Sequence, residues 1–216
     1  SRLLEATVFD VLPRNHFGAI LVDPPWKFER WSERNIMPGR ETEKHYNTMP
    51  TNEISKMPVD TLAAKNCVLF IWITWPMLEY SLKVIKDWGF QYKTCGFAWI
   101  KANNRQMDLL QDDLKVDMTC GYWTRANSEV CLLATKGKPK RLDAGVRQAI
   151  IAPRREHSRK PDGIHERIER LVAGPYLELF ARQKREGWTV WGNQTDKFPM
   201  GRNVETELLG PSSQSS

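Results

Sequence analysis

Four consecutive residues, Asp23, Pro24, Pro25 and Trp26, combine groups that suit the binding of a planar amine. They follow the short apolar run 17–22, which is typical of a buried strand. Open α/β sheets bind ligands at the carboxyl ends of their strands, where these residues would lie. The carboxylate offers acceptors, the prolines stiffen the turn so that its carbonyls can face a ligand, and the indole offers a flat face. The same residues also fit a tight turn with a packing aromatic, and taken alone they favour neither interpretation.

Such a clamp would suit a heteroaromatic amine that has to attack an electrophile. The nitrogen lone pair of this amine is delocalised into its ring, so the amine is a poor nucleophile. Acceptors on both N–H protons, supplied by Asp23 and the Pro24 carbonyl, would favour a pyramidal nitrogen with its lone pair freed. Stacking on Trp26 would add about 1–3 kcal/mol. Holding the electrophile in line with this nitrogen can lower the reaction barrier by roughly 7–11 kcal/mol. The predicted catalytic residues are therefore those of the clamp: Asp23, Pro24, Pro25 and Trp26.

The elements that position this turn alternate between strand and helix. The apolar patterns predict strands at 17–22, 67–73, 92–101, 129–135, 176–181 and 188–191. They predict helices that open at 74–76 and at Pro161 and that stop at Gly89 and Gly174. The expected fold is α/β, with a mainly parallel, doubly wound sheet. Two polar tracts, 27–50 and 102–127, read as long functional loops.

Composition narrows the class of protein. The 216 residues suggest one domain over 1–197, followed by a disordered tail over 198–216. No apolar run approaches the roughly 20 residues of a membrane helix, and no signal peptide is recognisable, so we expect no membrane contact and a cytoplasmic location. The four cysteines are far apart and read as free thiols, mostly buried, and the four histidines lack ligand spacing, so no metal site is expected.

Positive charge is concentrated in one stretch. Residues 136–160 hold nine basic and two acidic side chains. Their net charge, nine minus two or +7, exceeds the net charge of +6 for the whole chain. The segment could be a solvated loop, but this concentration favours contact with a polyanion such as nucleic acid. The basic residues proposed to hold that partner are Lys136, Lys138, Lys140, Arg141, Arg154 and Arg155.

Several short motifs extend the acceptor turn into a family resemblance. The turn after an apolar strand resembles the acceptor motif of S-adenosylmethionine-dependent amino-methyltransferases. The further motifs are Tyr46-Asn47-Thr48-Met49, Leu69-Phe70-Ile71-Trp72, Ser158-Arg159-Lys160-Pro161-Asp162, Glu178-Leu179-Phe180-Ala181-Arg182 and Gly192-Asn193-Gln194. In this order, over residues 9–196, they resemble the MT-A type (METTL-like) adenine-N6 methyltransferases, the family of the messenger-RNA adenosine methyltransferase catalytic subunit, and in particular its bacterial and phage members.

The resemblance implies a Rossmann-like methyltransferase fold with a permuted motif order, in which the acceptor motif precedes the cofactor motif. It also implies S-adenosylmethionine as cofactor and Tyr46 as a residue near cofactor and acceptor. The implied cofactor-binding residues are Asp10, Val11, Asp23, Lys160, Phe180, Arg182, Asn193 and Gln194. Phe180 could instead be a core residue, and Asn193-Gln194 could be a turn. The chain departs from the eukaryotic catalytic subunit at Lys184 and Arg185, where that protein has a His-Asn pair.

The implied activity is methyl transfer to the N6 amino group of adenine in a nucleic acid, with DNA favoured over RNA. Two alternatives remain open: transfer to cytosine N4, and a non-catalytic nucleic-acid-binding subunit. Relatives commonly pair, so a homodimer or paralogous heterodimer through 102–127 is expected. The resemblance to bacterial and phage members places the protein in the cytoplasm of a bacterium or of a phage-infected host.

Overall fold

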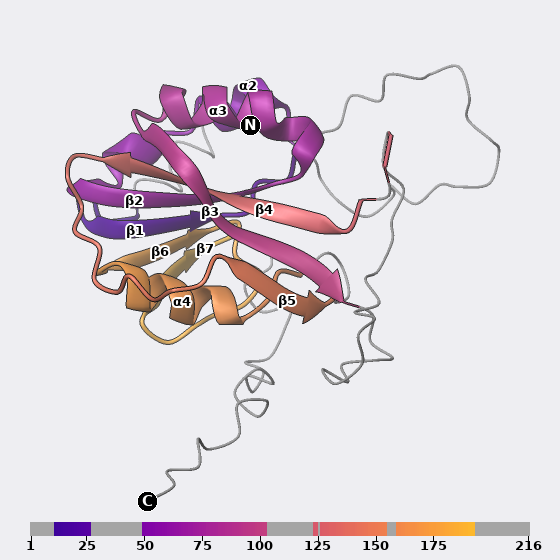
Figure 1. Ribbon diagram of the computed structural model, residues 1–216. Helices are drawn as coiled ribbons and strands as arrows, with labels where there is room; N and C mark the ends of the chain where they lie inside the picture. The colour runs from indigo at the N-terminus through magenta and orange to yellow at the C-terminus, as the bar shows by residue number, and fades with distance from the viewer. Residues whose placement is uncertain (1–10, 27–48, 103–122, 125, 155–158, 193–216) are drawn as a thin grey trace, which may run out of the picture.

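A seven-stranded sheet forms the centre of the molecule. The computed structural model describes residues 11–26, 49–102, 123–124, 126–154 and 159–192. The strand order is β5-β3-β4-β2-β1-β6-β7 (Figure 1). The strands are β1 (Phe17–Val22), β2 (Ala63–Ile73), β3 (Gln91–Ala102), β4 (Ser128–Lys136), β5 (Ala149–Pro153), β6 (Tyr176–Leu179) and β7 (Trp188–Trp191). The helices are α2 (Thr51–Ser55), α3 (Leu78–Asp87) and α4 (Gly163–Leu171), with 3-10 helices η1 (Val59–Thr61) and η2 (Trp75–Met77).

The strand directions confirm a mainly parallel sheet. β1 is parallel to β2 and β6, β6 is parallel to β7, and β3 is parallel to β5. β4 is antiparallel to both of its neighbours, so it runs against the other six strands. We call the edge where those six strands end and β4 begins the carboxyl edge. It is marked by Val22 of β1, Ile73 of β2 and Ser128 of β4.

Helices cover both faces of the sheet, as in a doubly wound fold (Figure 1). On the α2 and α3 face, Ile20 and Ile71 pack in one apolar cluster with Val84 of α3. On the opposite face, Leu21 of β1 belongs to a second cluster that includes Ile164 of α4. The central strands are therefore buried on both sides, which explains their continuous apolar sequences.

Several elements differ from the sequence-based expectation: α2 and η1 were not predicted, and β2 begins at Ala63 rather than at 67. β5 lies inside the basic stretch, where no strand was predicted, and it pairs only with β3 at the edge of the sheet. β6 ends at Leu179 rather than 181, because Phe180 adopts a left-handed backbone with φ of 61°. Gly89, with φ of 73°, follows α3 as predicted for a helix stop.

The remaining composition-based expectations concern cysteines, metals and membranes. Cys67, Cys95 and Cys131 are free thiols, and burial raises the pKa of Cys67 to about 12, which makes it unreactive at neutral pH. Cys120 lies outside the described residues. Within the described ranges, no group of three His, Cys, Asp or Glu residues could hold a metal ion. No helix in those ranges is long and apolar enough to cross a bilayer.

Candidate functional site

Asp23 follows β1 at the carboxyl edge, between the ends of β2 and β6. Val22 is in register with Ile71 of β2 and with Leu179 of β6, so Asp23 lies just beyond both. The chain leaves β1 for β2 by way of α2 on one face, and it reaches β6 from α4 on the other (Figure 1). The gap between β1 and β6 is thus the point where the connections change face. Ligands of open α/β sheets bind at this kind of position.

The turn after Asp23 is fixed by its own backbone and by Trp26. The Pro24 carbonyl accepts the Trp26 N–H at 2.8 Å, and the Pro25 carbonyl accepts the Met49 N–H at 2.8 Å. The Trp26 indole N–H donates to the Trp72 carbonyl at 3.0 Å, and the ring is only 8% exposed. The expectation that Trp26 offers an open stacking face is therefore wrong for this structure, because the ring packs in the core. Trp26 is therefore an anchor of the turn, and the Pro24 carbonyl has a second lone pair beside the one that accepts the Trp26 N–H.

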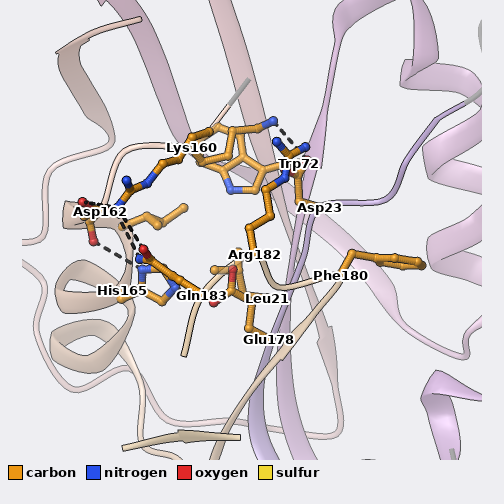
Figure 2. A pocket seen from close by; sticks show the side chains of 12 residues that line it. Leu21, Asp23, Trp72, Lys160, Asp162, His165, Glu178, Phe180, Arg182 and Gln183 are labelled. Carbon is orange, nitrogen blue, oxygen red and sulfur yellow. Dashed lines mark hydrogen bonds and ion pairs between the residues drawn. The ribbon is translucent and has the colours of Figure 1, made fainter. Parts of the chain in front are cut away.

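A lysine and a glutamate from distant segments meet Asp23. The Lys160 Nζ lies 3.0 Å from the Asp23 carboxylate (Figure 2). It also lies 3.2 Å from the Glu129 carboxylate. Glu129 also pairs with Lys101 at 2.6 Å. The Lys160 ammonium stands over the Trp72 ring, 5.6 Å from its centroid. Asp23, Lys160, Glu129 and Lys101 thus form a row of alternating charge, and we call it the charged row.

The direction of β4 explains how Glu129 reaches this row. β4 begins at the carboxyl edge, so its second residue lies at the level where the parallel strands end. Glu129 is in register with Trp99 of β3, and Lys101 follows two residues later on the same strand. Sequence reasoning gave no role to Glu129. Its signal was an acidic residue at the start of an otherwise apolar strand.

Burial and pairing oppose each other in the charged row. Burial raises the pKa of Glu129, but the ammonium groups of Lys160 and Lys101 outweigh it, and the net shift is downward. Burial also lowers the pKa of Lys160, yet the carboxylates of Asp23 and Glu129 outweigh it and the net shift is upward. Both pairings therefore stabilise the charged forms at neutral pH.

Buried polar contacts hold the segment around Lys160 in place. The Arg159 guanidinium donates to both oxygens of Asp162 at 3.2 Å and to the Gln183 side chain at 2.9 Å. His165 of α4 meets the Glu178 carboxylate of β6 at 2.8 Å. These contacts join the start of α4 to β6 and to the segment after it. None of these side chains was assigned a role from the sequence.

A pocket opens between these groups and the end of β6 (Figure 2). Among its lining residues, Asp23, Lys160, Phe180 and Arg182 were predicted from the sequence. The Phe180 ring packs edge-on against Trp191 at 5.3 Å, so Phe180 is both a pocket residue and part of the core periphery. The complete lining is Leu21, Asp23, Trp72, Arg159, Lys160, Asp162, Ile164, His165, Glu178, Phe180, Arg182 and Gln183.

One hydrogen-bond donor in this lining has no partner among the described residues. The Trp72 side chain is 1% exposed, and its indole N–H makes no hydrogen bond with any described group. An unsatisfied buried donor costs about 1–3 kcal/mol. A ligand acceptor in the pocket would satisfy it.

The structure does not bring together the described basic residues that were proposed to hold a nucleic acid. Lys136 donates to the Asp60 carbonyl, and the Lys138 N–H donates to the Asn66 side chain, so both lie at the edge opposite to Asp23. Lys140 and Arg141 lie near the carboxyl end of α4, where Leu142 bonds Leu171, and this end is also remote from the carboxyl edge. These residues are separated because the chain crosses the sheet along β5 within the basic stretch. Arg154 follows β5 and is at the carboxyl edge.

Five expected site residues, Asp10, Tyr46, Arg155, Asn193 and Gln194, lie outside the described residues. Val11 lies at the start of the described part and is 78% exposed.

Comparisons with known proteins agree with this arrangement. The MT-A70 family model matches residues 17–194. The chain is 30% identical over 201 residues to the Type II methyltransferase M.MunI of Mycoplasma sp, with 86% of this chain and 80% of that protein covered. It is 31% identical over 212 residues to the N(6)-adenosine-methyltransferase MT-A70-like protein of Drosophila melanogaster, with 96% and 30% covered. It is 29% identical over 191 residues to the N(6)-adenosine-methyltransferase catalytic subunit METTL3 of Homo sapiens, with 87% and 30% covered.

The chain thus spans most of the M.MunI protein and less than a third of the two animal proteins. The matched residues include the acceptor turn, the charged row and the pocket lining. The mixed sheet with helices on both faces is the Rossmann-like fold of these enzymes. The chain belongs to the MT-A70 family of methyltransferases.

Proposed function

We propose that this enzyme transfers the methyl group of S-adenosylmethionine to the N6 amino group of adenine in a nucleic acid, with DNA as the favoured substrate. The observation that carries the proposal is the Asp23 carboxylate at the end of β1, paired with Lys160 in the lining of a pocket. The names of the animal relatives specify N(6)-adenosine methylation. DNA is favoured because the small chain resembles bacterial and phage members of the family, and it covers 80% of a methyltransferase from Mycoplasma sp but only 30% of the animal proteins.

The residues of the pocket suit the chemical groups of the cofactor. The Lys160 ammonium is a partner for its carboxylate, and the free Trp72 N–H is a donor for an acceptor oxygen. Phe180 and Arg182 line the same pocket. By family resemblance, Asn193 and Gln194 would bind the ribose hydroxyls, and Asp10 and Val11 would bind the adenine of the cofactor.

The acceptor side of the reaction belongs to Asp23 and Pro24. One N–H of the target amine would donate to the Asp23 carboxylate, and the other would donate to the second lone pair of the Pro24 carbonyl. This arrangement directs the nitrogen lone pair out of the plane of the base. When bound, S-adenosylmethionine supplies a methyl group whose bond to sulfur breaks as the nitrogen–carbon bond forms, leaving a neutral thioether. Asp23 would then take the surplus amine proton and pass it to water.

Preorganisation is the main contribution of the chain. Trp26 anchors the turn in the core, and Arg159, Asp162 and Gln183 anchor the segment that carries Lys160. Correct placement of two reactants can lower a barrier by roughly 7–11 kcal/mol. A base in duplex DNA would have to leave its stack to reach Asp23, at a cost of a few kcal/mol.

The test is methyl incorporation by Asp23→Asn and by a matched variant, Asp143→Asn. Asp143 pairs with Arg170 on the exposed surface and has no contact with the pocket. We expect Asp23→Asn to lose labelled methyl transfer into adenine-containing oligonucleotides while its circular dichroism persists. Asp143→Asn should retain activity. Nucleoside mass spectrometry identifies the product, and activity in Asp23→Asn, or N4-methylcytosine as product, would contradict the proposal.

The same assay distinguishes DNA from RNA as the preferred substrate. Matched DNA and RNA oligonucleotides, single and double stranded, are methylated by the wild-type enzyme under identical salt. We expect faster incorporation into DNA. Self-association through 102–127 also stays a prediction, which sedimentation equilibrium of the full chain would check.

A further inference from the structure

An exposed aromatic side chain stands beside the acceptor site. Trp75 is the first residue of η2, two residues beyond the end of β2 at the carboxyl edge. It is 52% exposed, and it is not among the residues that line the pocket. Its indole N–H nevertheless donates to the Ser128 hydroxyl at 3.2 Å. A large flat ring is thus open to solvent, while its polar atom is already satisfied by the protein.

The backbone around Trp75 holds the ring in place. The Thr74 backbone is extended, and the ring of Pro76, directly after Trp75, fixes the φ angle of Pro76 in the 3-10 turn. The Met77 N–H closes this turn on the Thr74 carbonyl at 2.9 Å, and the Met77 side chain is buried. A ring fixed by a short turn and a hydrogen bond loses little conformational freedom when a ligand covers it. This preorganisation distinguishes Trp75 from a mobile surface aromatic.

Trp75 and the acceptor carboxylate follow two paired strands at the carboxyl edge. Val22 of β1 is in register with Ile71 of β2, so Asp23 and Trp75 both lie a short way beyond this pair. The partner of the indole, Ser128, begins β4 at the same edge. Trp75 therefore lies at the same edge of the sheet as the acceptor site and outside the pocket lining.

We propose that Trp75 stacks on an unpaired base next to the target adenine. This inference rests on the proposed function, because it assumes a nucleic-acid substrate. A nucleobase fits the observations because its flat face needs only a flat partner, and base–aromatic stacking tolerates every base. A polyanionic strand along the carboxyl edge would also meet Arg154, which follows β5 at this edge. A strand whose target base reaches Asp23 would lie along the same edge.

The test combines Trp75 variants with abasic substrates. Oligonucleotides carry one adenine, with an abasic nucleotide at each neighbouring position in turn. We expect Trp75→Ala to raise KM for the intact oligonucleotide between about 5-fold and 100-fold, with kcat unchanged. Trp75→Phe keeps a ring and should retain most of the affinity. Tyr92→Ala is the matched control, because Tyr92 is 43% exposed at the start of β3, on the opposite edge of the sheet, and it should match wild type.

The abasic series supplies the decisive comparison, and its wild-type arm needs no variant to fold. In wild type, one abasic position should raise KM by about the same factor as Trp75→Ala, and Trp75→Ala should be insensitive to that position. If wild type methylates adenine but Trp75→Ala matches it on every substrate, the inference is overturned and the proposed function stands. If wild type methylates no oligonucleotide, the proposed function fails and takes the inference with it. A third outcome is that Trp75→Ala loses the same factor in KM on every substrate, abasic or intact, and sediments with a lower mass than wild type. That result would identify Trp75 as a self-association surface and overturn the inference.

Discussion

Lys160 and Asp23 form a 3.0 Å ion pair although they are far apart in the sequence. The same ammonium lies 3.2 Å from Glu129, so one cation serves two carboxylates. The side chains of Lys160 and Asp23 are 15% and 21% exposed, which leaves solvent little part in balancing the charges. The acceptor carboxylate thus has its counter-ion before any substrate arrives.

Replacing Lys160 with Gln should destabilise the fold by about 3 kcal/mol at pH 7, because two mostly buried carboxylates lose a shared cation. The folded-state pKa of Lys160 is raised, so its contribution is fully present below the unfolded pKa of about 10.4 and declines as pH rises through the folded value. Urea unfolding of wild type and variant at pH 7, 9 and 11 measures this difference.

The control for that substitution is Lys83→Gln, which removes an exposed helix pair with Asp87. It should reduce the free energy of unfolding far less than Lys160→Gln. A Lys160→Gln effect that stays constant up to pH 11, or one no larger than that of Lys83→Gln, would show that the pairing contributes little.

Replacing Glu129 with Gln should flatten the acid side of the stability curve. The folded-state pKa of Glu129 is lowered, so its contribution is present above the unfolded value of about 4.3 and is lost as pH falls through the folded value. Wild type should therefore lose stability more steeply than Glu129→Gln below about pH 4.3. Urea titrations at pH 3, 4, 5 and 7 test this, and parallel acid curves for the two proteins would refute it.

Replacing Trp26 with Phe should lower kcat and should cost about 1–3 kcal/mol of stability, because the buried Trp72 carbonyl loses its donor. Trp88→Phe is a matched control, since the Trp88 N–H donates to the buried Ile54 carbonyl at the same 3.0 Å on the α2 and α3 face. We expect similar losses in denaturation but a fall in kcat only for Trp26→Phe, assayed well below both melting temperatures. Equal kcat values for the two variants would remove Trp26 from the positioning of the turn.

Replacing Gln183 with Ala should weaken S-adenosylmethionine binding about 10-fold with a smaller change in kcat. Gln183 accepts a hydrogen bond from buried Arg159, next to Lys160, so its loss frees one wall of the pocket. Gln148→Ala provides the comparison, because Gln148 bonds the Cys95 carbonyl outside the pocket lining. Calorimetry measures both affinities, and an unchanged affinity in Gln183→Ala would leave the Arg159 contact with a structural role alone.

The regular parts of the fold are readable from the sequence because they are uniform. β1 and β2 are buried on both faces, which produces continuous apolar runs, and α3 and α4 show apolar residues at helical spacing. β5 is not indicated, because Ala149–Pro153 is a five-residue edge strand within a basic segment and buries only alternate side chains. The short helix α2 likewise has too few residues for a periodic pattern.

The site is only partly readable for a different reason. Asp23, Lys160, Phe180 and Arg182 stand in short motifs, so local sequence identifies them. Glu129 joins them only through the antiparallel pairing of β4, which no local pattern specifies. The contact of Trp26 with Trp72 is also a tertiary contact, and it accompanies burial of the ring that the motif suggested would be open to a ligand.

The direction of β4 also bears on how this family can diversify. The Lys101 N–H donates to the Asn127 carbonyl, so the segment that joins β3 to β4 leaves and re-enters the sheet at one point of the carboxyl edge. We expect residues inserted or exchanged between these two points to be attached beside the charged row and outside the strand pairings. Such changes would alter the surroundings of the acceptor carboxylate while leaving the Asp23–Lys160 pair in place.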